Sequence, residues 1–284
     1  MTDAGDSKGG AAAPSDALDH LRFWSLTLAI IVTFAAPALL LAAPLLYRAG
    51  LVSLETARGS LSDVAFWLAA AGGVLSLVVV GVHAMRAPKR GVIAGVALST
   101  VALSALGNVY GFQVLRETLP PIHDVQTDWS RPVAFSENAL AAREAAGAAP
   151  IRDDAMVDTD GVWAGKSVAA AQADAYSLKP LLVDVPPADA TVAVEEAAKR
   201  MGWSVMRSDP PGGMVEAVHY STWYGLGSDI AVRVTAQGMG SRIDVRSTSR
   251  TSGSDEGANA KRVTNLLDDV AFALRANAQE SRAE

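Results

Sequence analysis

The first 113 residues contain three long runs of apolar positions, whereas the rest of the chain alternates short apolar and polar stretches. The runs cover residues 23–46, 64–85 and 91–112, and each is long enough to cross a hydrocarbon core, which needs about 20 helical residues. Residues 1–19 are small and polar and have nothing to bury. The sequence therefore predicts a disordered tail over residues 1–19 and three transmembrane helices within residues 20–113.

The first apolar run has two interpretations. Small residues of the Ala-Ala-Pro type follow its apolar stretch, as they do in a cleaved signal peptide. Its length and the two further runs that come directly after it favour a membrane helix that is retained.

A stripe of small residues, Gly91, Gly95 and Ser99, follows one side of the third run and allows another helix to approach closely. That helix belongs either to a second copy of the chain or to the same bundle. Packing within the chain's own bundle is the simpler interpretation.

Period-two alternation predicts two strands near the C-terminus. Residues 229–237 and 241–249 alternate apolar and polar positions, which is the pattern of half-buried strands. The Gly-Met dipeptide between them suits a two-residue hairpin turn of type II′. Such a turn fixes the register and places Arg233 opposite Asp244.

Further short elements complete a soluble domain over residues 136–284. Strands are expected at residues 181–185, 203–206 and 214–221, and helices after a cap at Asp189 or Thr191 and after Ser254 or Asp255. This order predicts the α+β class: three N-terminal transmembrane helices, then a soluble antiparallel sheet domain with helices packed on one face. The proline-containing residues 114–135 are expected to form an extended linker between the two parts.

Composition agrees with a membrane protein that carries a soluble part. Half of the 284 residues are hydrophobic and 19% are charged. The net charge of −6 argues against nucleic acid as a partner, because nucleic-acid-binding proteins carry basic surfaces. The absence of cysteine excludes disulfides and cysteine-ligated metal sites.

The short loop at residues 86–90 reads RAPKR and holds three basic residues. Basic short loops stay on the cytoplasmic side of a membrane. Alternation of the three spans then places the N-terminus in the cytoplasm and the C-terminal domain outside it. In a bacterial cell this means the inner membrane and the periplasm.

Three separated motifs occur in order in the second half of the chain. They read PPIHDVQTD from Pro120, LKPLLVDVPPA from Leu178 and DVRSTSRTSGSDEGANAKRV from Asp244. Together they resemble the family labelled domain of unknown function 1499. The resemblance implies a small envelope-facing α/β domain, often behind transmembrane helices in bacterial members, with no assigned activity.

The same resemblance singles out a set of polar residues as characteristic of the family. They are His123, Asp124, Arg233, Asp244, Arg246, Ser249, Arg250, Asp255, Asn259 and Arg262. The family pattern leads us to expect paired acids in the strand before Arg233. The chain departs from it there, with Asp229 followed by Ile230.

The charged face of the last hairpin suggests a binding surface. If this face is open, His219, Arg233, Asp244 and Arg246 line a polar surface for an anionic ligand, a membrane lipid headgroup or an envelope protein. The alternative interpretation is that these charges only tie a helix to the sheet.

A second group of residues is expected to converge where the last strand meets the last helix. It consists of Arg246, Arg250, Asp255, Asn259 and Arg262. Asn259 lies on the apolar stripe of that helix, so its amide should point toward the sheet.

An enzyme remains the alternative function. An envelope hydrolase would use Ser249 or His219 with Asp255. A serine nucleophile needs a base that a third group orients, and the spacing of these residues shows no such arrangement. We therefore expect a non-enzymatic binding or structural module of the cell envelope, without a cofactor.

A metal site could use His123, Asp124 and Asp128 together with His219 as ligands. Adjacent residues of an extended chain point in opposite directions, and the spacing typical of zinc sites is absent. The sequence predicts hydrogen bonding for these residues and no metal site.

Overall fold

The computed structural model describes residues 14–85, 89–157 and 160–283. The chain divides into two compact units, Met1–Gln113 and Val114–Glu284. Each unit has its own packing and is described by itself.

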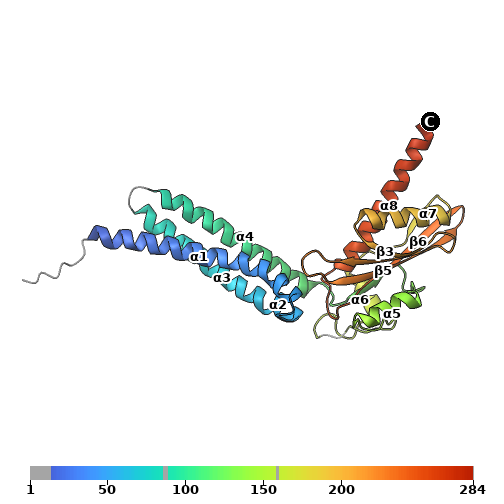
Figure 1. Cartoon of the computed structure of the whole chain (residues 1–284), viewed down its shortest axis with the longest axis horizontal. Helices are drawn as coiled ribbons and strands as arrows, with labels where there is room; N and C mark the ends of the chain where they lie inside the picture. The colour runs from blue at the N-terminus through green and yellow to red at the C-terminus, as the bar shows by residue number, and fades with distance from the viewer. Residues whose placement is uncertain (1–13, 86–88, 158–159, 284) are drawn as a thin grey trace, which may run out of the picture. The chain divides into compact units, whose positions relative to one another are not determined.

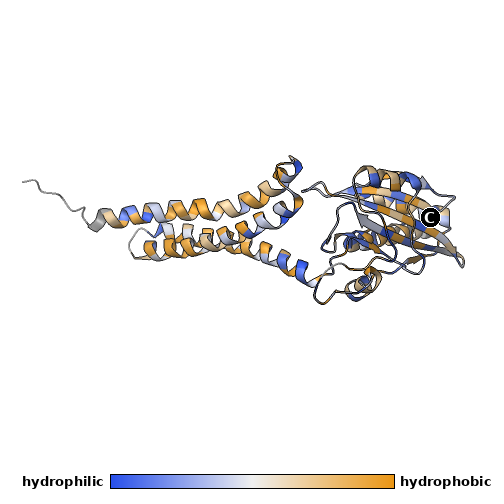
Figure 2. Ribbon diagram, turned by 90° about the horizontal axis from the view of Figure 1, so that it is seen from below, coloured by the Kyte–Doolittle hydropathy of each residue, from blue (hydrophilic) through white to orange (hydrophobic). Residues whose placement is uncertain are grey.

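The N-terminal unit consists of apolar helices. They are α1 (Pro14–Arg48), α2 (Leu54–Arg58), α3 (Ser60–Ala84) and most of α4 (Arg90–Thr118). Hydrophobic residues follow the three long helices in Figure 2. Three helical stretches are long and apolar enough to cross a membrane, Ala17–Arg48, Leu54–Ala84 and Arg90–Thr118. The three predicted long apolar helices are therefore confirmed.

Two sequence-based assignments fall partly outside the described residues. These are residues 1–13 of the predicted tail and residues 86–88 of the basic loop. Residues 14–19, which we assigned to the tail, instead begin α1. Pro14 suits this position, because the first turn of a helix does not need the N–H that proline lacks.

The small-residue stripe of α4 packs against α3 of the same chain. A Cβ atom added to Gly95 would lie 2.7 Å from a methyl group of Val80, and one added to Gly91 would collide with the His83 ring. Glycine is thus required at both positions for the close approach of the two helices. The stripe serves the chain's own bundle.

The C-terminal unit is built on a six-stranded sheet whose strand pairs are all antiparallel. Its strands are β1 (Asp124–Gln126), β2 (Leu181–Val183), β3 (Ser204–Asp209), β4 (Met214–Tyr220), β5 (Gly227–Gln237) and β6 (Gly240–Ser249). The order is β1-β6-β5-β4-β3, and β2 pairs with the same edge of β6 as β1. Arg233 pairs with Asp244, so the predicted hairpin register is confirmed.

Two helices, α7 (Pro187–Arg200) and α8 (Ala258–Ala283), pack on one face of the sheet (Figure 1). The core between them and the sheet includes Val194, Ala197, Ile243, Val245, Val263 and Leu266. The start of α7 was predicted too late, since the helix begins at Pro187 rather than after Asp189 or Thr191. Proline at the first helical position has a backbone angle that suits a helix, so α7 begins there without a side-chain cap.

The other face of the sheet was expected to be open, and this expectation is wrong. Helix α5 (Glu137–Ala145) lies on this side in Figure 1, and the segment before it packs Val133 and Phe135 onto Ala231 of β5. As a result, Asp244 and Arg246 are only 0% and 2% exposed. We call residues 127–136 the covering segment. Its apolar side chains Val133 and Phe135 hold it on the charged strands.

Residues 114–135 were predicted to be a linker, but part of this stretch belongs to the sheet domain. Residues 124–126 form β1 on the edge of β6, and Ile122 and Val125 lie in the main core. Residues 114–118 form the end of α4 instead of an extended chain, whereas the edge strand β1 is compatible with the extended conformation that proline favours.

Helix α6 (Val168–Ala175) protects the outer edge of β1. The Gln126 N–H donates to the Gln172 side-chain oxygen at 2.9 Å, and the Gln172 amide donates to the Gln126 carbonyl at 2.7 Å. One amide side chain thus takes the place of a neighbouring strand. At the opposite edge of the sheet, β3 has an irregularity between Val205 and Arg207. The fold class, long apolar helices followed by an antiparallel sheet with helices, is confirmed.

Candidate functional site

Strand β6 distributes the predicted site residues over both faces of the sheet. Side chains two residues apart share a face, so Asp244 and Arg246 lie on the face covered by the segment before α5, whereas Ser247 and Ser249 lie toward α8. The predicted convergence of Arg246, Arg250 and Arg262 therefore does not occur. The structure contains two polar groups, which we call the ionic layer and the helix-side cluster.

The ionic layer lies on the face of the sheet that α5 and the segment before it cover. Its arginines are Arg131, Arg143, Arg233, Arg242, Arg246 and Arg250, and its aspartates are Asp124, Asp128, Asp153, Asp229 and Asp244. Every one of these side chains makes at least one ion pair with another member of the layer.

Arg246 is the most deeply buried arginine of the layer, at 2% exposed. Its Nη2 and Nε donate to the two carboxylate oxygens of Asp124 at 2.5 and 3.1 Å, and its Nη1 donates to Asp153 at 2.6 Å. Burial opposes the charge of this guanidinium, but the hydrogen bonds and charges of Asp124 and Asp153 outweigh burial and raise its pKa. The bidentate pair with Asp124 fastens β1 to β6.

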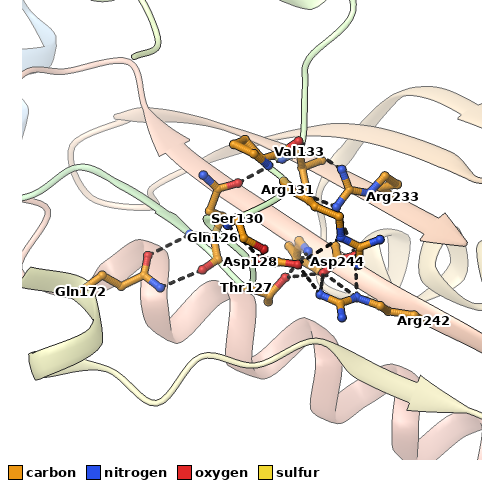
Figure 3. A network of polar contacts seen from close by, with 12 residues as sticks. Gln126, Thr127, Asp128, Ser130, Arg131, Val133, Gln172, Arg233, Arg242 and Asp244 are labelled. Atoms are coloured by element: carbon orange, nitrogen blue, oxygen red, sulfur yellow. Dashed lines mark hydrogen bonds and ion pairs between the residues drawn. The ribbon is translucent and has the colours of Figure 1, made fainter. Parts of the chain in front are cut away.

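Asp244 is the centre of the network in Figure 3. It accepts hydrogen bonds from Arg242 at 2.9 to 3.2 Å, from Arg233 at 3.2 Å and from the Thr127 hydroxyl at 3.3 Å. Arg242 also donates to Asp128 at 2.5 Å. The covering segment is thereby tied to the hairpin at several points.

Asp128 also stabilises a turn in the covering segment. Its carboxylate accepts from the Ser130 hydroxyl at 2.6 Å and from the Ser130 N–H at 2.9 Å. The hydroxyl bond is the main reason why the pKa of Asp128 is lowered to about 2.

Sequence reasoning missed two residues of the α5 side. Arg143 of α5 is 3% exposed and donates to Asp229 at 2.6 Å and to the carbonyls of Ala149, Thr248 and Ser249. Glu216 is also 3% exposed and accepts from the N–H and the hydroxyl of Ser136, both at 2.6 Å. Ser136 caps α5, so a buried carboxylate on the sheet fixes the start of the helix that covers it.

The helix-side cluster consists of Ser247, Ser249, Asn259 and Arg262. It is organised by Asn259, which is fully buried at the start of α8. Its amide donates to the His123 carbonyl at 2.9 Å and to the Ser249 hydroxyl at 3.0 Å. Its oxygen accepts from the Ser247 hydroxyl at 2.8 Å and from Arg262. The prediction that this amide points toward the sheet is confirmed.

Arg262 differs from the arginines of the ionic layer, because it makes no ion pair within the described part of the chain. Its Nη1 donates to the neutral oxygens of Ser247, at 3.1 Å, and Asn259. Burial lowers its pKa, and the charge of Asp255 offsets this only in part. A guanidinium stays charged in proteins, so a half-buried positive charge remains without a carboxylate partner.

His219 lies on the same face, near Arg262. It pairs across the sheet with Ser228, which pairs with Ser249, so the three side chains share a face. Its ring centroid is 6.4 Å from that of Trp203. Burial first, and then the charge of Arg262, lower the pKa of His219. The ring is therefore neutral near pH 7, and Arg262 supplies the positive charge.

The residues of the hydrolase alternative are used for other contacts. Ser249 bonds to the amide of Asn259, and Asp255 accepts the N–H groups of Gly257 and Asn259 at 2.9 and 2.8 Å, which caps α8. Burial raises the pKa of Asp255. Among the described residues, no hydrogen bond joins Ser249 to His219, and no group of His, Asp and Glu has the arrangement of a metal site.

Residues 124–272 match the family described as protein of unknown function (DUF1499). The match begins at the first residue of β1 and ends within α8, and it covers more than half of the chain. The chain belongs to this family. No curated protein matches it.

The DUF1499 region includes both polar groups, while all three long apolar helices precede it. The departure from the expected acid pair has a structural counterpart within this region. Asp229 alone accepts from both Arg143, at 2.6 Å, and Arg250, at 2.7 and 2.9 Å. One carboxylate therefore serves two guanidinium groups.

Proposed function

We propose that this protein is a membrane-anchored, non-enzymatic binding module of the bacterial cell envelope, and that it holds an anionic group at Arg262. The observation that carries the proposal is the half-buried guanidinium of Arg262, which donates only to neutral oxygens within the described residues. The ionic layer cannot serve in the same way, because its arginines are already paired with aspartates.

The surroundings of Arg262 fit a small anion such as a phosphate group. The hydroxyls of Ser228 and Ser249 and the neutral His219 ring share the face on which Arg262 reaches the sheet. Hydroxyl and imidazole N–H groups donate to anions, and a charge-assisted bond from a guanidinium is about twice as strong as a neutral one.

Arg262→Gln should weaken the binding of inorganic phosphate by at least about tenfold, since a charge-assisted bond is lost while an amide donor remains for Ser247 and Asn259. Isothermal titration of the full chain in detergent measures the affinity. Arg200→Gln is the matched control. It removes the same charge from an exposed ion pair between Arg200 of α7 and Asp269 of α8.

The control should bind phosphate as the natural protein does. Equal affinity in Arg262→Gln, or no phosphate binding by the natural protein, contradicts the proposed site. A urea titration of Arg262→Gln shows whether the variant is folded under the conditions of the binding experiment.

The location in this proposal places the sheet domain in the periplasm and the N-terminus in the cytoplasm. Three basic residues in the loop at residues 86–90 support this orientation, and the three apolar helices then direct the chain after α4 to the outer side.

An alkaline phosphatase fused after Glu284 should be active, because that enzyme folds only outside the cytoplasm, where disulfides form. The same reporter inserted in the loop at residues 86–90 should be inactive. Activity with the opposite distribution would reverse the orientation.

A further inference from the structure

An uncharged aromatic loop connects β4 to β5. Residues 220–227 read YSTWYGLG and contain three aromatic residues and no charged residue. Trp223 is 61% exposed and Tyr220 is 54% exposed. Such side chains cost free energy in water, and tryptophan and tyrosine are enriched where proteins meet the membrane–water interface.

The loop lies at the end of the sheet where the chain arrives from α4. Asp124, the first residue of β1, shares a cross-strand row with Thr248 and Asp229, and Asp229 is two residues from the start of β5. Adjacent strands are about 4.8 Å apart, so the loop begins within about 20 Å of Asp124. The β5–β6 turn with Met239 lies at the opposite end of the sheet.

The connection between α4 and β1 is short and firmly held within the C-terminal unit. Five residues lie between Thr118, the last residue of α4, and Asp124, and this connection spans at most about 20 Å. The N–H of Ser249 donates to the His123 carbonyl at 2.8 Å, and the N–H of Asp255 donates to the Ile122 carbonyl at 3.1 Å. The chain that leaves a membrane-spanning helix is therefore fixed to the same end of the sheet as the aromatic loop.

We infer that the loop at residues 220–227 docks on the lipid surface of the membrane that the helices of this chain span. Trp223 enters the interfacial region, and the absence of charge in the loop allows this without burying an ion. Tyr220 stays at the base of the loop, where its hydroxyl accepts from Arg250 at 3.3 Å. The site is separate from the anion site proposed at Arg262, so either inference can fail without the other.

The chain contains no cysteine, which permits a direct test. Thr222→Cys and Met239→Cys each introduce one labelling position, in the loop and at the fully exposed turn at the other end of the sheet. Both full-length variants are labelled with an environment-sensitive fluorophore and placed in phosphatidylcholine nanodiscs with nitroxide-labelled acyl chains. The label at residue 222 should be quenched at least about twofold more than the label at residue 239 and should emit at shorter wavelength, as expected at a lipid interface.

Adding Trp223→Ser to the Thr222→Cys variant should remove that difference, since the residue that anchors the loop is lost. Equal, water-like emission and quenching at both positions overturns the inference, and so does quenching at residue 222 that is unchanged by Trp223→Ser. Because Trp223 is exposed, the variant should retain the urea midpoint of its parent, and this measurement confirms that it is folded.

Discussion

Arg246→Ala should lower the free energy of unfolding of the sheet domain by about 3–5 kcal/mol, which is the typical cost of breaking a buried ion pair from one side. The substitution leaves Asp124, 8% exposed, without its bidentate guanidinium partner and removes the contact with Asp153. A urea titration of the full chain in detergent, followed by tryptophan fluorescence, measures the loss. Trp129 lies 5.8 Å from the Arg246 guanidinium and reports on this region.

Arg200→Ala is the control for this experiment. Its side chain is 46% exposed and pairs with Asp269 at 2.7 Å. Exposed pairs contribute about 0–1 kcal/mol, so the control should remain close to the natural protein. A loss below about 1 kcal/mol for Arg246→Ala would show that the pair with Asp124 is not the main tie between β1 and β6.

Asp229→Ala should be similarly costly, about 3–5 kcal/mol, because one buried carboxylate balances two guanidinium groups. Arg143 and Asp229 are each 3% exposed, and Arg143 would be left buried and charged. Arg250, whose side chain is 16% exposed, can turn partly toward water. The largest part of the loss therefore belongs to the pair with Arg143.

A double-mutant cycle separates this pair from the packing around it. Arg143→Ala and Asp229→Ala should couple by at least about 1 kcal/mol, so the double variant is less destabilised than the sum of the single variants. Arg152→Ala, in a pair with Asp154 whose side chains are 68% and 79% exposed, should have almost no effect. Additive losses at Arg143 and Asp229 would contradict a direct interaction between them.

The last hairpin could be predicted in detail because two local signals agree. The period-two pattern defines both strands, and the Gly-Met turn sets their register, so the pairing of Arg233 with Asp244 follows. The three apolar helices were equally accessible, since length and composition are enough to recognise them.

The covered face could not be predicted, because charged side chains on alternate positions normally indicate exposure to water. The segment that covers them has no regular periodicity, and its prolines suggest a linker. Arg143 lies in an alanine-rich helix, where a single arginine resembles an ordinary surface charge. One signal in the sequence did point to a covered face. The numbers of arginines and aspartates nearly balance in the three family motifs and in the segment that follows the first motif, and such a balance favours pairing inside the domain.

The amide of Gln172 has a consequence for contacts between copies of the sheet domain. A free strand edge offers unpaired N–H and C=O groups to the same edge of a neighbouring molecule. At Gln126 these groups are already occupied by Gln172, and the irregular β3 limits pairing at the other edge of the sheet. These two features therefore oppose the joining of sheets from neighbouring copies at β1 and at β3.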